Sequence, residues 1–303
     1  MNGQTKDWWR VSIEVNAAAE EASAAMLERE FGQAPVVNVD FESKRTLVAI
    51  YVSQPPPNRS AVTARIRENL RQIAALGLDA GPGRVAIAKV RREDWRHSWK
   101  KHFQPFEVGR SLLIRPSWSQ QRARRGQRLI VLDPGLSFGT GQHATTRYCL
   151  GAIAAASHSN ERRSFLDIGT GTGILAIAAA KLGFRKVAAL DLDPVAVRVA
   201  KLNARRNRVS CSITRADLSR LSSRSGNRFD LICANLIDTV LIKHTAKIVN
   251  RLSPQGQLVL AGILQSQFGP VTDAYLSRGL QLVNTAVAAG WQSATFAWPL
   301  IKF

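Results

Sequence analysis

Residues 164–173 read "SFLDIGTGTG", an apolar run that ends in three alternating glycines. The apolar run predicts a buried β-strand, and "ILAIAAAKLG" (174–183) predicts a helix directly after it. Glycines between a strand and a helix allow a tight turn and the close approach of a ligand, because no Cβ stands in the way. We therefore expect a ligand-binding turn at Gly169, Gly171 and Gly173.

The C-terminal half of the chain repeats this alternation of strand and helix. Further strand candidates are "KVAALDLD" (186–193), "CSIT" (211–214), "FDLICANL" (229–236) and "GQLVLAGIL" (256–264). Such alternation predicts a parallel sheet that helices cover on both faces. The late segments 280–288 and 294–301 are expected to pair as an antiparallel edge hairpin. The pattern indicates a doubly wound α/β domain, whose ligand lies outside the carboxyl ends of the strands.

A carboxylate precedes the glycines. Asp167 lies where a dinucleotide would place its pyrophosphate, and like charges that close repel each other. The chain also lacks the Gly-Lys-Ser/Thr of the phosphate loop found in nucleotide triphosphatases. A ligand that bears a cation suits such a site. S-adenosylmethionine carries an ammonium and a sulfonium beside an adenosine and has no phosphate, so we expect it as the cofactor.

Acidic residues end the next strand candidate. Asp191 lies 22 positions after Gly169, close to the spacing of about 20 residues at which a carboxylate reaches ribose hydroxyls. The alternative role, capping the helix that begins near Pro194, fits Asp193 better. Asp217 stays open between accepting a proton from an adenine amino group and standing in an exposed loop.

Asn235 ends the fourth strand candidate. Its amide offers both an acceptor and donors, so it can orient an amine by hydrogen bonds. A turn-satisfying role is the alternative. Because the residue stands at a strand's carboxyl end, we assign Asn235 the catalytic role and a place at the cofactor.

The first ninety or so residues predict a second, smaller domain of order βαββαβ, which is the ferredoxin-like α+β arrangement. Its second helix carries one apolar stripe, formed by Val62, Ile66, Leu70, Ile73 and Leu76. The region contains no catalytic cluster, so we expect it to recognise the substrate; a purely structural or dimerising role is the alternative.

Three domains are predicted along the chain. Residues 1–92 form the ferredoxin-like substrate-recognition domain, 93–130 a linker helix with an extension, and 131–303 the cofactor-binding domain. Trp95 and Trp99 are four positions apart in the linker and would share one helix face. Such aromatic residues more often dock a helix than stack on nucleic-acid bases.

The 303-residue chain has 42 Lys and Arg against 22 Asp and Glu, a net charge of +20. Such a surface attracts polyanions, so RNA is an expected neighbour, although the charge could simply serve solubility. One helix carries a basic stripe, namely Arg198, Lys201, Arg205 and Arg208, for which an ordinary solvated helix face is the favoured account. The three cysteines form no C-x-x-C pair, which favours a reducing, cytoplasmic location and no metal site. No apolar run approaches the roughly 20 residues of a membrane span.

The loop "DPGLSFGTGQHATT" (133–146), with the glycine turn, "ALDLDP" (189–194) and "ANLI" (234–237), carries a family resemblance. In these motifs the chain resembles the PrmA-type methyltransferases of the eleventh large-subunit ribosomal protein. The resemblance implies a Rossmann-like class I domain that transfers methyl groups from S-adenosylmethionine to lysine and N-terminal amines of that ribosomal protein. It further implies that the loop folds over the cofactor, with Thr146, Phe138, Gly139 and Thr140 as contacts beside Gly169, Asp191 and Asn235.

The loop departs from the family pattern at one point. Where the family usually has Thr-His-Pro-Thr-Thr, this chain has Gln142-His143-Ala144-Thr145-Thr146, and losing the proline frees one backbone torsion. His143 stays open between a proton acceptor near the amine and a structural hydrogen-bonding residue.

Two other activities remain as alternatives: an RNA base methyltransferase, which the charge favours, and a methyltransferase of another basic protein. Enzymes that flip a base commonly stack it on an aromatic residue, whereas Leu236 and Ile237 follow Asn235 here. We expect a monomeric enzyme.

Overall fold

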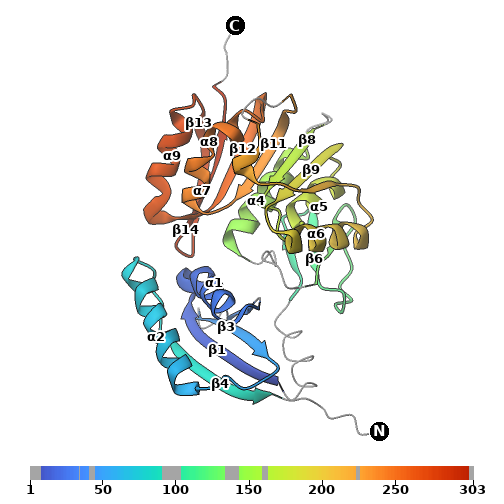
Figure 1. Cartoon of the computed structure of the whole chain (residues 1–303). Coiled ribbons are helices and arrows are strands. Elements are labelled where there is room, and N and C mark those ends of the chain that lie inside the picture. The colour runs from blue at the N-terminus through green and yellow to red at the C-terminus, as the bar shows by residue number, and fades with distance from the viewer. Residues whose placement is uncertain are drawn as a thin grey trace. The chain divides into compact units, whose positions relative to one another are not determined.

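The structure is a computed structural model that describes residues 8–33, 35–40, 45–90, 104–133, 143–158, 163–222 and 226–299. By its internal contacts the chain divides into two units, Met1–Gln104 and Pro105–Phe303 (Figure 1). The part of the predicted extension from Pro105 onward belongs to the second unit. The linker helix expected around Trp95 and Trp99 lies outside the described residues. No helix among the described residues is long and apolar enough to cross a membrane.

The first unit has the predicted ferredoxin-like order. Its elements are β1 (Trp8–Asn16), a short 3-10 turn η1 (Ala17–Ala19), α1 (Glu20–Phe31), β2 (Val36–Asp40), β3 (Arg45–Val52), α2 (Arg59–Ala75) and β4 (Arg84–Val90). The four strands form one sheet of order β2-β3-β1-β4, and every neighbouring pair is antiparallel. The prediction of this fold is confirmed.

The apolar stripe of α2 is confirmed in four of its five positions. The helix begins after Asn58, whose side chain accepts a hydrogen bond from the Ala61 amide at 3.0 Å. Val62, Ile66, Leu70 and Ile73 are buried. Leu76 was assigned to the same stripe, which is wrong: its side chain is 74% exposed. The reason is that α2 ends at Ala75, so Leu76 no longer follows the helical face that packs on the sheet.

The second unit is built on a seven-stranded sheet of order β10-β9-β8-β11-β12-β14-β13. Neighbours among β8 to β12 are parallel, whereas β14 runs antiparallel to β12. The strands are β8 (Ser164–Ile168), β9 (Lys186–Asp191), β10 (Ser212–Arg215), β11 (Phe229–Asn235), β12 (Leu252–Leu264), β13 (Gln281–Ala288) and β14 (Trp291–Ala297). The predicted antiparallel hairpin is confirmed. Of its two strands, β14 lies inside the sheet and β13 forms one edge.

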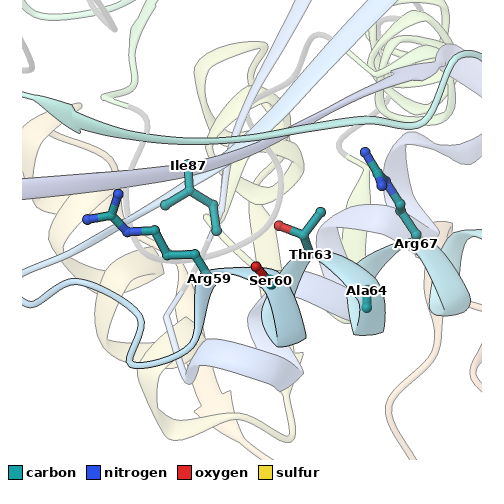
Figure 2. Close-up of a pocket in the computed structure, with 6 residues that line it drawn as sticks. All are labelled: Arg59, Ser60, Thr63, Ala64, Arg67 and Ile87. Carbon is teal, nitrogen blue, oxygen red and sulfur yellow. The ribbon is translucent and has the colours of Figure 1, made fainter.

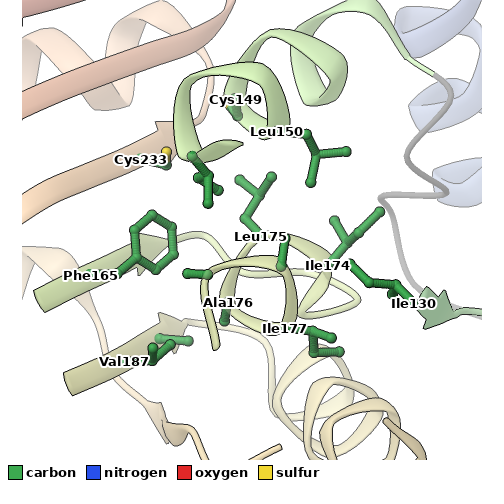
Figure 3. Packing of buried hydrophobic residues seen from close by; sticks show 14 of the residues in the cluster. Ile130, Cys149, Leu150, Phe165, Ile174, Leu175, Ala176, Ile177, Val187 and Cys233 are labelled. Carbon is green, nitrogen blue, oxygen red and sulfur yellow. The ribbon is translucent and has the colours of Figure 1, made fainter. Parts of the chain in front are cut away.

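Helices cover both faces of this sheet, as predicted for a doubly wound domain (Figure 1). They are α4 (Ala144–Ala156), α5 (Ile174–Lys181), α6 (Pro194–Arg206), α7 (Asp238–Lys243), α8 (Thr245–Val249) and α9 (Phe268–Leu276), with 3-10 turns η2 (Leu218–Arg220) and η3 (Gln265–Gln267). One apolar cluster joins the sheet to α4, α5 and α6 (Figure 3), and the other joins it to α7, α8 and α9. The second unit therefore has a core on each side of the sheet.

A small sheet of β5 (Phe106–Val108), β6 (Leu112–Arg115) and β7 (Arg128–Val131) packs on the same domain. The side chain of Asn207, at the end of α6, forms hydrogen bonds with the backbone of β7 as a neighbouring strand would. Its Oδ1 accepts from the Val131 amide at 2.8 Å, and its Nδ2 donates to the Val131 carbonyl at 2.8 Å. The Asn207 side chain is buried, so water has little access to replace it as the hydrogen-bond partner of the Val131 backbone.

We expect Asn207→Leu to lower the free energy of unfolding by about 2 kcal/mol, because the substitution leaves the partly buried amide and carbonyl of Val131 unpaired. Urea unfolding measures this directly. Asn284→Leu, in the exposed edge strand β13, is the control, because water can replace its exposed hydrogen bond from the Thr285 amide. Equal stability of the Asn207→Leu and wild-type proteins would contradict the role assigned to Asn207.

Candidate cofactor and active site

The glycine turn joins β8 to α5 over five residues. Gly169, Gly171 and Gly173 have φ of 76°, 52° and 83°, in the left-handed region that side chains rarely adopt. A Cβ on Gly169 would lie 2.5 Å from Leu236 Cδ2, and one on Gly173 would lie 3.0 Å from the Ala200 Cβ. Backbone conformation and packing therefore both require glycine, and we call the turn of residues 169–173 the glycine cradle.

Asp167 lies beneath this turn and is 0% exposed. Its Oδ2 accepts a hydrogen bond from the Thr170 hydroxyl at 2.6 Å, while Oδ1 makes no hydrogen bond of ordinary geometry with the described residues. Burial raises the pKa of this carboxyl to about 7; the Thr170 hydroxyl and the Ala176 amide lower it, and the Asp191 charge adds to the rise. A buried acceptor without a partner suits a cationic ligand, whose charge would favour the ionised form.

The raised pKa of Asp167 makes a testable claim about stability. The folded protein holds a proton that the unfolded chain releases above its ordinary pKa of 3.8, so the free energy of unfolding falls as pH rises towards about 7. Between pH 5 and pH 7 we expect wild type to lose about 2–3 kcal/mol relative to Asp167→Asn. Urea unfolding of both proteins at several pH values checks this, and parallel profiles would show that Asp167 is ionised throughout.

Asp191 ends β9 and holds the glycine turn from the neighbouring strand. Its Oδ2 accepts from the Gly171 amide at 2.9 Å, and its Oδ1 accepts from the Asp193 amide at 3.0 Å. A carboxylate has about four acceptor positions, so acceptor capacity remains for a pair of ribose hydroxyls. The helix-capping role falls to Asp193, as predicted: its Oδ1 accepts from the Val195 amide at 2.8 Å, and Pro194 begins α6.

Asn235 ends β11, opposite Ala261 of β12. Its side chain lies against Gly262, where a Cβ would come within 3.0 Å of Asn235 Oδ1 and 2.9 Å of the Leu236 carbonyl. Gly262 therefore makes room for Asn235, a role that the sequence analysis missed. The available signal was a lone glycine inside a strand pattern, which commonly marks a close backbone approach.

Helix α4 reaches the same edge of the sheet. Cys149 of α4 and Cys233 of β11 are buried neighbours (Figure 3), and Cys149 contributes to raising the pKa of the Cys233 thiol, after burial. Thr146 lies one helical turn before Cys149, and Asn235 lies two residues after Cys233. Because α4 follows the sheet in the opposite direction to β11, Thr146 and Asn235 come to the same end of the domain.

His143 caps α4. Its Nδ1 lies 2.7 Å from the Thr145 hydroxyl and accepts from the Thr145 amide at 3.4 Å, and its ring packs edge-on against Trp291. Burial lowers the pKa of His143 to about 4, so the ring is neutral. These contacts match the structural alternative for His143. The predicted contacts Phe138, Gly139 and Thr140 lie outside the described residues.

Two further residues support the turn and were not found from the sequence. Asn203 of α6 donates to the Thr172 carbonyl at 2.9 Å, and Leu236 packs on Gly169. Asp217 caps the 3-10 turn η2 by accepting from the Ser219 amide at 2.7 Å, and its contact with an adenine amino group stays a prediction. The site thus assembles the glycine turn, Asp167, Asp191 and Asn235 at the carboxyl ends of three adjacent strands, β9, β8 and β11.

Comparison with known proteins identifies this arrangement. The family model described as "Ribosomal protein L11 methyltransferase (PrmA)" matches residues 7–298. The chain belongs to the PrmA family. Family membership and fold make it an S-adenosylmethionine-dependent methyltransferase of the Rossmann-like class. A buried Asp167 oxygen that has no hydrogen-bond partner among the described residues, beneath a turn of glycines, fits a cofactor that is cationic and lacks phosphate.

Relatives in the PrmA family match over almost the whole chain. A ribosomal protein L11 methyltransferase from Trichlorobacter lovleyi is 37% identical over 94% of this chain and 96% of its own length. The corresponding protein from Geobacter metallireducens is 32% identical with the same coverage. The crystal structure of a ribosomal protein L11 methylase from Lactobacillus delbrueckii subsp. bulgaricus is similar with a TM-score of 0.58 and 29% identity, covering 65% of this chain and 99% of that one.

Proposed function

We propose that this protein transfers methyl groups from S-adenosylmethionine to lysine and N-terminal amines of ribosomal protein L11. The observation that carries the proposal is the hydrogen bond from the Gly171 amide to the Asp191 carboxylate in a chain of the PrmA family. It joins the ribose-binding candidate to the glycine turn, with Asn235 beside them. The relatives' names supply the protein substrate.

The reaction chiefly requires the protein to align the cofactor and the attacking amine. S-adenosylmethionine supplies a methyl group that its sulfonium already activates. Asp191 would hold the ribose, Asp167 would favour the ammonium, and Asn235 would orient the attacking amine. A lysine ammonium, with a reference pKa of about 10.4, must first lose its proton, and desolvation next to a cation favours the neutral amine. His143 is occupied in capping α4 and has no part in this scheme.

Transfer of labelled methyl groups tests the proposal. The full-length protein is incubated with radiolabelled S-adenosylmethionine and purified ribosomal proteins, both free and bound to ribosomal RNA. Label in L11 alone supports the proposal. Label in RNA would favour base methylation, and label in a different protein would keep the reaction but replace the substrate.

The N-terminal unit is proposed to grip the protein substrate. An open hollow of about 380 Å³ lies between α2 and β4 (Figure 2). Its lining combines two cationic side chains, two hydroxyls and an apolar floor: Arg59, Ser60, Thr63, Ala64, Arg67 and Ile87. Such a lining suits a polypeptide segment that presents a carboxylate, because guanidinium groups pair with carboxylates in a bidentate manner.

We expect Thr63→Trp, which fills the hollow, to raise KM for L11 about tenfold, with the affinity for S-adenosylmethionine unchanged. Steady-state methylation and isothermal titration measure the two quantities. Gln72→Trp places the same bulk on an exposed part of α2 outside the hollow and serves as the control. The same KM for Thr63→Trp as for wild type would exclude the hollow from substrate recognition.

We also propose that the enzyme works in the cytoplasm, near RNA, as a monomer. The three cysteines are free, which suits a reducing compartment. The candidate site draws all its groups from one chain, so assembly needs no second copy. Light scattering should give the mass of one chain, 33.2 kDa; twice that mass would contradict the monomer.

A further inference from the structure

The positive charge is concentrated in one part of the chain. Residues 1–90 contain 11 Lys and Arg against 10 Asp and Glu, a net charge of +1. Residues 91–303 contain 31 against 12, a net charge of +19, which accounts for the rest of the total of +20. The N-terminal region is therefore almost neutral, and the attraction for polyanions belongs to the methyltransferase domain and the segment before it.

Within the methyltransferase domain, a group of cations lies at the amino ends of the parallel strands. Cationic side chains gather where helices end and parallel strands begin, and we call them the basic edge: Arg128, Lys181, Arg185, Arg205, Arg208 and Arg228. Lys181 ends α5, Arg205 lies in the last turn of α6, and Arg228 directly precedes β11. Lys181 is half-buried, and the other five side chains are exposed.

The opposite edge of the sheet carries carboxylates. Asp167, Asp191 and Asp193 stand at the carboxyl ends of β8 and β9, where the cofactor site lies. A strand of six residues such as β9 spans about 20 Å, which exceeds the Debye length of about 8 Å at physiological ionic strength. The basic edge is therefore electrostatically separate from the cofactor site.

Three cations of the basic edge converge from three different elements. Burial, then the charges of Arg128 and Arg208, lower the pKa of Lys181, so the three groups lie close enough to repel. Arg208 has φ of 55°, a left-handed conformation that usually falls to glycine after a helix. The negative ends of the α5 and α6 dipoles offset part of this repulsion. The repulsion that remains among the three cations favours binding of an anion.

Carboxylates near the basic edge are already engaged. Asp133 accepts from the Ser117 amide at 2.6 Å and pairs with Arg206. Asp230 accepts from the Ser164 amide and from the Ser253 hydroxyl. Among the described residues, neither carboxylate is paired with a member of the basic edge. The charge of the edge is therefore available to an external partner.

We propose that the basic edge binds the phosphate backbone of RNA. Five of its six members are arginines, whose planar guanidinium groups bind phosphate in a bidentate manner. The choice of RNA over another polyanion rests on the proposed function, because a ribosomal substrate is met beside ribosomal RNA. RNA on this edge leaves the cofactor edge open to the substrate amine. It also screens the positive surface that would otherwise repel a basic protein.

The test compares two triple variants of the full-length protein. Arg128→Gln, Lys181→Gln and Arg208→Gln together remove the converging cations. Arg29→Gln, Arg71→Gln and Arg84→Gln remove the same charge from exposed positions of the first unit. Fluorescence anisotropy with a fluorescein-labelled single-stranded RNA is measured from about 50 to 200 mM KCl. We expect the edge triple to bind more than tenfold more weakly at the lowest salt, with a salt slope smaller by about 2.

The control triple is expected to keep the affinity and the slope of wild type. Equal weakening in both triples, or no RNA binding by wild type, would overturn the proposal. Polyglutamate that competes as well as RNA would overturn the choice of RNA. Methylation of free L11 is expected to stay within about twofold of wild type in the edge triple, since no residue of the triple touches the cofactor site. If the proposed function is wrong, the wild-type protein does not methylate L11, and its RNA binding can still be measured.

Discussion

Asn235→Ala is expected to lower kcat for L11 methylation about 100-fold, while the affinity for S-adenosylmethionine stays within about threefold of wild type. The side chain lies at the carboxyl end of β11, next to Gly262, whose missing Cβ leaves it room. An amide there can orient a neutral amine by its acceptor and donors. Loss of that alignment reduces the fraction of productive encounters and leaves the cofactor's own contacts in place.

Single-turnover methylation and isothermal titration separate the two effects. Asn284→Ala, in the exposed edge strand β13, is a matched control, because it removes the same amide at a distance from the site. If the alanine variant at position 235 transferred methyl groups at the wild-type rate, Asn235 would have no catalytic role.

Asp191→Ala should weaken S-adenosylmethionine binding by about 3 kcal/mol, on the order of 100-fold. The substitution removes the acceptors proposed for the ribose hydroxyls. It also releases the Gly171 amide, which Asp191 holds at 2.9 Å, so the cradle loses its support. The first loss acts on the bound state and the second loosens a turn that is already formed in the free protein, and hydrogen bonds to a charged acceptor are among the stronger ones.

Asp193→Ala provides the control two residues away. It removes a carboxylate of the same strand end that caps α6, so it should cost about 1 kcal/mol of stability and leave cofactor affinity nearly unchanged. Titration calorimetry on both variants, with urea unfolding to measure stability, distinguishes binding from capping. Equal affinities of Asp191→Ala and wild type for the cofactor would remove Asp191 from the site.

Local patterns predicted the architecture because each depends on short-range chemistry. A few residues are enough to predict the local conformation in each case: alternating strands and helices, a glycine turn, and a proline after Asp193. The observed sheets agree with these predictions. Leu76 shows the limit of such patterns. Its spacing continued the apolar stripe of α2, but the helix ended one residue earlier and left it exposed.

The supporting residues could not be predicted in the same way. Asn207 satisfies the backbone of β7, which lies 76 positions away in sequence, and Gly262 matters only because Asn235 packs on it. The Asn207 contact has no local signature, and a lone glycine in a strand pattern signals a close approach at position 262 without indicating which residue approaches. The bonds of Asp191 to Gly171 and of Asn203 to Thr172 likewise depend on how neighbouring elements meet.

Periodicity was sufficient for the two folds and for placing the carboxylates at the strand ends, because parallel strands bring their ends to one edge whatever their loops do. The cofactor class followed from the carboxylate before the glycine motif and from the family resemblance. Tertiary contacts alone decided that Asp167 is buried with an unpaired oxygen and a raised pKa. They also decided that His143 caps a helix and that the cations lie on the edge opposite the cofactor site. Burial and the direction of a helix relative to its sheet are properties of packing, and a linear sequence carries them only through the fold.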